Sequence, residues 1–225
     1  MTEQSSVFDM IGPVMIGPSS SHTAGVVRIG RVARKILGAS PEKAVITFYN
    51  SFARTYEGHG SDRAIIAGLL DYHTDDTRIK ISFQEAEEAG FTYRFKAIGN
   101  ASTMHPNTVK VEVIYKEKSI SVIGESRGGG VIKITEVNGF GVGFNGNLTT
   151  MILTAEDKKG AIAFIATILA NDDCNIASMS VTRKGKNDLA CHVIEMDSEP
   201  PKVTVDYIKH LNWINEVVFI PEIDF

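Results

Sequence analysis

A run of hydroxyl side chains and one histidine follows two Gly-Pro pairs near the start of the sequence. An amphipathic pattern begins within the run and predicts a helix over residues 21–37. A helix N-terminus presents unpaired N–H groups and a partial positive charge, so the run suits a carboxylate or a phosphate. Serine is also a favoured helix cap, so capping without a ligand is the simpler alternative. The run consists of Ser19, Ser20, Ser21, His22 and Thr23.

Three further polar loops could carry chemistry. His59 lies between two glycines just before a second predicted helix, where it could exchange a proton near neutral pH. The loop over residues 100–107 contains His105 and Asn107, and three glycines follow one another at 128–130. Each loop also has a purely structural alternative. The His59 loop could be a turn with a solvated imidazole, residues 100–107 could be a plain connecting loop, and the three glycines could form a simple hairpin turn.

The cysteines and histidines give the chain no metal site of its own. Cys174 and Cys191 are the only cysteines, and neither a Cys-x-x-Cys nor a His-Glu-x-x-His motif occurs. Two thiols do not make a disulfide framework, so both are expected to be reduced core residues of a cytoplasmic protein.

Composition narrows the class of protein. Hydrophobic residues make up 43% of the 225 residues and charged residues 22%, which is ordinary for a globular chain. The net charge of −4 argues against a nucleic-acid partner. No apolar run approaches the ~20 residues that span a bilayer, and residues 1–8 lack the regions of a secretory signal. We therefore expect neither nucleic acid nor membrane among its partners.

The elements that must position these loops follow from periodicity. In the first part, helical spacing predicts helices over 21–37 and 63–72, and apolar character predicts a strand over 44–48. Strict alternation then predicts antiparallel strands over 108–115, 119–123 and 131–137. Helices followed by consecutive strands indicate an α+β class.

Three glycines within residues 140–147 predict a linker over 141–147, between domains at 1–140 and 148–225. The second part has the order strand-helix-strand-strand-helix-strand, which is the ferredoxin-like βαββαβ arrangement. Its expected elements are 149–153, 160–170, 177–182, 189–196, 201–211 and 217–220.

The string Gly-Pro-Ser-Ser-Ser-His-Thr at 17–23, with Gly-His-Gly-Ser-Asp at 58–62 and the glycines at 128–130, resembles the beta subunit of bacterial iron-sulfur-dependent L-serine dehydratase. The segments 157–160 and 175–179 resemble those of an ACT domain, a small-molecule regulatory module. The resemblance implies deamination of L-serine to pyruvate and ammonia without pyridoxal phosphate. It also implies a 4Fe-4S cluster whose cysteine ligands belong to a partner alpha subunit, with iron acting as a Lewis acid on the leaving hydroxyl. This polypeptide alone should then be inactive.

The resemblance also implies roles for the polar loops. The hydroxyls of Ser19, Ser20, Ser21 and Thr23 would bind the serine carboxylate, and His22 and His59 are candidates for proton transfer or for orienting the substrate. His105 and Asn107 would complete the pocket, and the α-proton base stays open because the alpha subunit could supply it. Gly160 would admit an effector to the ACT domain, which is expected to self-associate; dimerisation without an effector is the alternative.

A second interpretation keeps the protein out of catalysis. The serine-rich loop would then bind an amino acid purely as an effector, in a regulatory protein that senses amino acids. A partner chain with a cysteine set for a 4Fe-4S cluster separates the two interpretations, because only the enzyme needs it.

Overall fold

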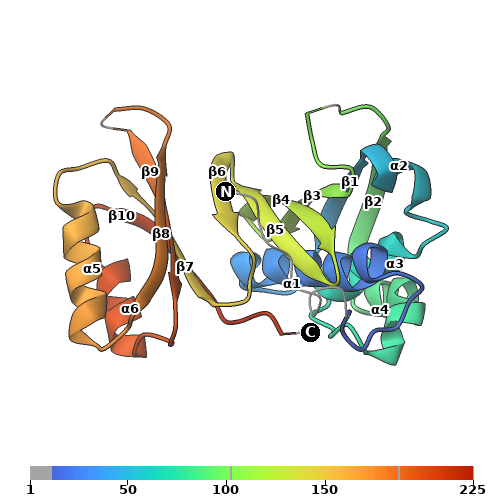
Figure 1. Ribbon diagram of the computed structural model, residues 1–225, viewed down its shortest axis with the longest axis horizontal. Coiled ribbons are helices and arrows are strands. Elements are labelled where there is room, and N and C mark those ends of the chain that lie inside the picture. Colours follow the sequence, from blue (N-terminus) through green and yellow to red (C-terminus); the bar gives the residue numbers. More distant parts are fainter. Residues whose placement is uncertain (1–11, 102, 187, 225) are drawn as a thin grey trace. The chain divides into compact units, whose positions relative to one another are not determined.

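The computed structural model describes residues 12–101, 103–186 and 188–224 (Figure 1). The chain divides into two compact units. The first contains the residues up to Asn138 together with Asp224, and the second contains Gly139–Ile223. Over the described ranges, no helix is both long and apolar enough to cross a bilayer. The limits expected from sequence, 1–140 and 148–225, stay predictions.

A mixed sheet forms the centre of the first unit. Its strands are β1 (Lys43–Tyr49), β2 (Thr92–Ile98), β3 (Thr108–Tyr115), β4 (Lys118–Gly128) and β5 (Val131–Val137). They lie in the order β2-β1-β3-β4-β5, and all neighbours are antiparallel except β1 and β2. Val109, Val111 and Val113 are completely buried, so the alternation that predicted β3 does mark its core-facing side. The α+β class is confirmed.

The sequence pattern predicts only antiparallel strands and does not predict β2, which pairs in parallel with β1. Parallel strands need a long crossover, and here the chain between β1 and β2 supplies one with several helices. They are α2 (Asn50–Thr55), α3 (Ser61–Leu69), the 3₁₀-helix η3 (Thr77–Ile81) and α4 (Ser82–Glu88). Of these, only α3 gave a clear helical pattern, because α2 and α4 are too short to show one.

Two glycines allow the helix after the serine run to approach α3 closely. This helix, α1 (Gly25–Leu37), ends at Gly38, whose φ of 76° is left-handed. A Cβ atom on Gly68 would lie 2.2 Å from the Val27 carbonyl oxygen, and one on Gly30 would lie 2.9 Å from the Cα of Gly68. Because neither position has room for a side chain, the two backbones meet directly, and the loops that precede both helices are held near each other.

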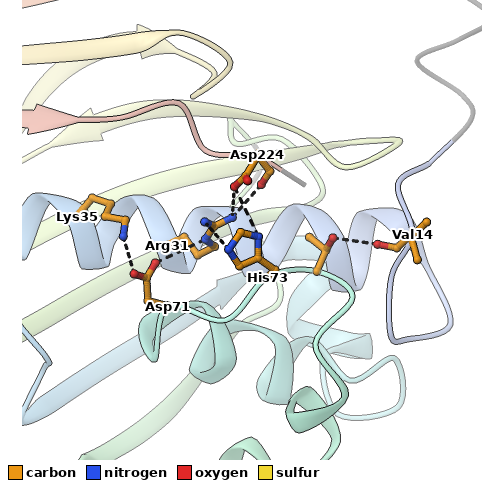
Figure 2. Close-up of polar contacts among 7 residues, drawn as sticks. Val14, Arg31, Lys35, Asp71, His73 and Asp224 are labelled. Atoms are coloured by element: carbon orange, nitrogen blue, oxygen red, sulfur yellow. Dashed lines mark hydrogen bonds and ion pairs between the residues drawn. The ribbon is translucent and has the colours of Figure 1, made fainter. Parts of the chain in front are cut away.

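Arg31 of α1 carries a buried guanidinium with several polar partners (Figure 2). Arg31 is 5% exposed, and its Nη1 donates to the carbonyl oxygen and to Oδ1 of Asp224 at 2.8 and 2.9 Å. Its Nε lies 3.6 Å from Oδ1 of Asp71. The other oxygen of that carboxylate, Oδ2, accepts from Lys35 at 2.5 Å. His73 completes the cluster, 3.4 Å from Nη2 of Arg31. A charge this deeply buried is stable only when it is paired.

The second unit is confirmed as ferredoxin-like. Its antiparallel strands lie in the order β10-β7-β9-β8, with α5 and α6 covering one face (Figure 1). Ile165 of α5, Ile208 of α6 and Ile194 of β9 meet in one apolar cluster. The elements are β7 (Thr149–Glu156), α5 (Ala161–Asn171), β8 (Ile176–Arg183), β9 (Leu189–Met196), α6 (Lys202–Lys209) and β10 (Ile214–Ile220).

The expected linker over 141–147 is not irregular throughout, because Phe140–Phe144 forms the strand β6. Phe140 and Phe144 are buried, whereas the two glycines between them, Gly141 and Gly143, are exposed. The residues therefore alternate with a period of two, as a half-buried strand requires. Glycine content alone suggested a turn and concealed this alternation.

Candidate active site

The serine run folds into a widened helical turn. Ser20–Ala24 forms the π-helical turn η2, which continues directly into α1, so the predicted helix begins one residue earlier and with a different geometry. Ser19 is its N-cap, and its Oγ accepts from the His22 backbone N–H at 3.4 Å. The capping alternative is therefore part of the answer, although it uses only this one serine. Single π-turns occur frequently at functional sites.

His22 is held through both ring nitrogens. Nδ1 lies 3.3 Å from Ser19 Oγ and 3.1 Å from Ser21 Oγ, and Nε2 lies 3.1 Å from Thr55 Oγ1. Thr55 donates its single hydroxyl hydrogen to the Ser51 carbonyl at 2.9 Å, so its oxygen must accept from His22. The hydrogen-bond network thus assigns the proton to Nε2 and leaves Nδ1 as the acceptor of a serine hydroxyl.

The environment of His22 favours the neutral ring. Burial lowers the pKa of His22 below its usual value, and the neighbouring His59 lowers it further. The ring centroids of the two histidines are 4.5 Å apart, and the ring planes are at 89°. Phe52 packs edge-to-face on His22 from α2, with centroids 5.0 Å apart. A neutral, packed and doubly hydrogen-bonded imidazole has a fixed orientation.

His59 is the exposed member of the pair. It belongs to the turn between α2 and α3, where its backbone N–H donates to the Thr55 carbonyl at 3.0 Å. The next residue, Gly60, has a left-handed φ of 71°, which favours glycine and reverses the chain into α3. No side-chain hydrogen bond to the His59 ring is present in the described part of the chain. The geometry therefore fixes the backbone of His59 and leaves its imidazole accessible.

The loop over 101–107 is tied to the start of α2. Asn50 adopts a left-handed φ of 51°, its Oδ1 accepts from the Ala101 N–H at 2.7 Å, and its Nδ2 donates to the carbonyls of Ala101 and Met104. The predicted residues His105 and Asn107 contact each other, since Nδ1 of His105 accepts from the Asn107 N–H at 3.2 Å. Burial, and secondarily Arg127, lowers the pKa of His105. The structure shows no contact between His105 and the pair His22–His59.

The glycines at 128–130 form a turn that also hydrogen-bonds to the serine run, so a hairpin turn alone does not describe them. Ser20 Oγ accepts from the Gly129 N–H at 3.2 Å, and Arg28 of α1 donates to the Gly130 carbonyl at 2.9 Å. All three glycines have left-handed φ angles, of 96°, 59° and 82°. A non-glycine residue would strain this backbone at each position.

Three elements at and near the serine run, η2, α3 and β4, each contain a buried hydroxyl oxygen without a hydrogen-bond partner in the described residues. Thr23 follows His22, Ser61 begins α3, and Ser126 precedes the glycines. Such an oxygen costs about 1–3 kcal/mol when it stays unsatisfied. Unpaired hydroxyls at sites this deeply buried are uncommon in native proteins and mark positions where water or a ligand is expected.

The comparisons with known proteins agree with these features. A family model described as "Serine dehydratase beta chain" matches residues 6–96. The "Probable L-serine dehydratase, beta chain" of Bacillus subtilis is 46% identical over 217 residues, which are 96% of this chain and 98% of the relative. The "L-serine dehydratase, beta chain" of Peptoniphilus asaccharolyticus is 37% identical, over 85% of this chain and 87% of that one.

This chain belongs to the family of L-serine dehydratase beta chains. It is thus part of an L-serine ammonia-lyase, and a beta chain implies an alpha-chain partner. The D-3-phosphoglycerate dehydrogenase of Bacillus subtilis is 23% identical over 88% of this chain but only 37% of its own length. A solved ACT domain from the GTP pyrophosphokinase of Chlorobium tepidum aligns with 32% of this chain and 95% of its own, at 18% identity and a TM-score of 0.27.

Sequence reasoning missed one residue of this candidate site, Thr55, and gave Ser126, which begins the glycine-rich candidate loop, no role of its own. Thr55 fixes the tautomer of His22 from 33 positions away, and Ser126 carries one of the unpaired hydroxyls. Thr55 stands four residues before His59, so a helical interpretation of 50–59 would have placed them on one face. Ser126 adjoins Gly25, where a Cβ atom would lie 2.1 Å from its Oγ. This close approach has no local sequence signal.

The chain's own residues do not fit an iron-sulfur cluster. Cys174 and Cys191 are both buried in the second unit, and burial raises the pKa of Cys191 to about 11. No group of three potential metal ligands occurs in the described part of the chain. Such a cluster binds through thiolates, commonly four of them, which this beta chain cannot supply.

Gly160 lies in the second unit, at the N-cap of α5, with a left-handed φ of 83°. A Cβ atom built there would meet nothing within 4 Å. Its role in effector binding stays a prediction.

Proposed function

We propose that the first unit contributes one wall of the L-serine pocket, made by the serine run, Thr55 and the histidine pair, and that the alpha chain covers this wall. The observation that carries the proposal is the pairing of a fixed, neutral His22 with an exposed His59, at 4.5 Å between ring centroids. A general base must lie within reach of the proton that it removes from the substrate. The exposed His59 imidazole can meet this requirement once the alpha chain covers the wall and encloses the substrate.

His59 is the better candidate for the α-proton base. Both nitrogens of His22 are already hydrogen-bonded and its Nε2 carries a proton, so His22 has no free lone pair to offer. His59 has a lone pair available when neutral. We propose that His59 accepts the Cα proton as the β-hydroxyl departs, and that the resulting aminoacrylate tautomerises and is hydrolysed to pyruvate and ammonia. His22 then positions His59 and the serines.

The serine hydroxyls are proposed to bind the substrate carboxylate. Nδ1 of His22 has one lone pair and can accept from either Ser19 or Ser21. The Oγ atoms of these two serines lie 3.2 Å apart, so the second hydroxyl can donate to its neighbour or, when substrate is bound, to the carboxylate. Ser20 accepts from Gly129 and keeps its own hydrogen. Donors to a carboxylate are strengthened by its charge. His105 and Asn107 are proposed to form the rim of the pocket, through the loop tied to α2.

Two further parts of the enzyme are proposed to lie outside this wall. A 4Fe-4S cluster on the alpha chain would supply a Lewis acid, and no pyridoxal phosphate is used. The second unit is proposed to be an ACT domain that self-associates and binds an effector near Gly160. A thermal shift of the full chain with L-serine that disappears in Gly160→Val would support effector binding, whereas an unchanged shift would contradict it.

The test of catalysis is anaerobic co-expression with the alpha chain, followed by a pyruvate assay with L-serine. We expect His59→Asn to lower kcat by about 10²–10⁴ with little change in assembly, since general bases contribute this much. His210→Asn is the matched control and should keep full turnover. His210 is the C-cap residue of α6 in the second unit. Wild-type turnover of His59→Asn in the assembled complex would refute the assignment.

A further inference from the structure

A cavity of about 200 Å³ adjoins the Gly17-Pro18 pair, and its lining includes none of the residues from Ser19 to His22. Ile16 and Ile79 contribute apolar walls, while Thr23, Arg63 and Lys80 are its polar side chains. Arg63 and Lys80 are exposed, whereas Thr23 is only 1% exposed. The cavity therefore combines a buried hydroxyl with two cations at the surface.

The hydroxyl of Thr23 lies against Gly17, another lining residue, and is unpaired among the described residues. A Cβ atom on Gly17, which lines the cavity, would lie 2.3 Å from Thr23 Oγ1. This oxygen has no hydrogen-bond partner among the residues that the structure describes. The loop around it is fixed, because the Thr74 carbonyl accepts from the Ile16 N–H at 2.8 Å and the Thr74 hydroxyl donates to the Val14 carbonyl at 3.0 Å. A buried donor in a fixed wall is expected to meet an acceptor.

The two cations are available to a ligand. The Cζ of Arg63 lies 5.3 Å from the ring centroid of Phe83, and such stacking leaves the edge N–H groups of a guanidinium free. No ion pair of Lys80 occurs within the described ranges. Of the acids nearest in sequence, Asp62 accepts from the Arg63 backbone N–H at 2.8 Å through Oδ1, and Asp76 binds Arg78 at 2.6 Å. Neither carboxylate lines the cavity.

We propose that this cavity binds a small oxyanion, the carboxylate or phosphate group of a metabolite no larger than an amino acid. A volume of about 200 Å³ lies below the ~300 Å³ at which pockets for drug-sized ligands begin. A hydroxyl, a guanidinium and an ammonium side chain line the cavity and no carboxylate does, which favours a ligand with negative charge. Thr23 and Gly60, which line the cavity, directly follow His22 and His59, so the cavity lies beside the histidine pair. Neither imidazole lines it, and the proposal does not require the catalytic roles proposed for them.

The test uses the full chain without its alpha partner, titrated calorimetrically at low ionic strength with inorganic phosphate, L-serine and pyruvate. We expect saturable binding of at least one probe that persists in Gly160→Val, since the second unit is proposed to bind an effector of its own. Phosphate alone would identify a phosphate site, and binding of both L-serine and pyruvate would identify a carboxylate site. Arg63→Gln and Lys80→Gln should each weaken binding about tenfold, the loss expected for a charge-assisted hydrogen bond.

Matched variants separate a built site from general surface charge. Arg94→Gln and Lys43→Gln remove exposed cations that do not line the cavity and should leave the affinity unchanged. Thr23→Val should weaken binding about tenfold, and Thr23→Ser should restore it. His59→Asn should bind the probe normally even when turnover of the complex is lost.

Equal losses in the control and cavity variants would overturn the proposal, as would the absence of saturable binding by all three probes. If Thr23→Val does not fold, the comparison of Lys80→Gln with Lys43→Gln decides, because both substitutions are at exposed positions.

Discussion

At the scale of single residues, the site depends on which groups are neutral and which are unpaired. Burial and His59 both lower the pKa of His22, which favours the neutral ring, and a neutral ring lets Nδ1 accept from a serine. The buried oxygens of Thr23, Ser61 and Ser126 lack partners within the described part of the chain. A protein keeps such unfavourable groups where function needs them.

The lowered pKa of His22 predicts how stability depends on pH. The unfolded chain binds more protons than the folded chain between the folded pKa and the ordinary value of 6.5, so stability falls as pH drops through this window. We expect the free energy of unfolding in urea to decrease from pH 7.5 to pH 5.5, with His105 and His192 contributing in the same direction.

His22→Gln should reduce this slope, by at most one proton or about 1.4 kcal/mol per pH unit. His210→Gln is the control and should keep the slope. An identical slope in wild type and His22→Gln would show that His22 is not neutral in the fold. The raised pKa of the buried Asp62 acts in the opposite direction toward lower pH, which is why the measurement stops at pH 5.5.

At the scale of elements, the site is positioned by the contact between α1 and α3. The serine run precedes α1 and His59 precedes α3, so the separation of the two helix axes sets the distance between the histidines. Gly30 and Gly68 permit that separation, since a Cβ atom on Gly68 would lie 2.2 Å from the Val27 carbonyl oxygen.

Gly68→Ala is therefore expected to destabilise the chain by about 1–3 kcal/mol, the usual cost of overpacking, although alanine favours a helix interior over glycine. Urea unfolding measures the loss. Gly99→Ala is the control, because a Cβ atom there would meet nothing within 4 Å. Equal stability of Gly68→Ala and wild type would contradict the close helix contact.

At the scale of the whole molecule, one residue from the end of the sequence belongs to the first unit. Asp224 follows the last strand of the second unit, yet it pairs with Arg31 of α1 (Figure 2). The Asp224 side chain is 63% exposed, so water screens it, and Arg31 also has Asp71 within 3.6 Å. The pair should contribute modestly, as exposed ion pairs do.

Asp224→Ala is expected to lower the free energy of unfolding by about 0.5–1 kcal/mol, because the carbonyl oxygen of residue 224 still accepts from Arg31. Glu222→Ala, also exposed, should have no effect. The measurement is urea unfolding at low and high salt, and the difference should shrink at high salt. A loss of several kcal/mol would mean that Arg31 depends mainly on this carboxylate.

Sequence by itself determined the elements whose pattern is local. Alternation in 108–115 and 131–137 gave β3 and β5 with their observed bounds, and the order of elements in the second unit gave its ferredoxin-like topology. The hydroxyl-histidine run and the glycine-flanked His59 also pointed to the site, because their residue types carry the chemistry. Periodicity failed where elements are short or paired over a long crossover, as with α2 and β2.

Only the tertiary structure decided how those loops meet. Thr55 fixes the proton of His22 across 33 positions, Gly129 contacts Ser20 across 109, and Thr23 turns to a cavity that its neighbours do not line. Such contacts depend on how closely two helices and a sheet approach one another. No local pattern encodes that distance, since packing of the entire unit sets it.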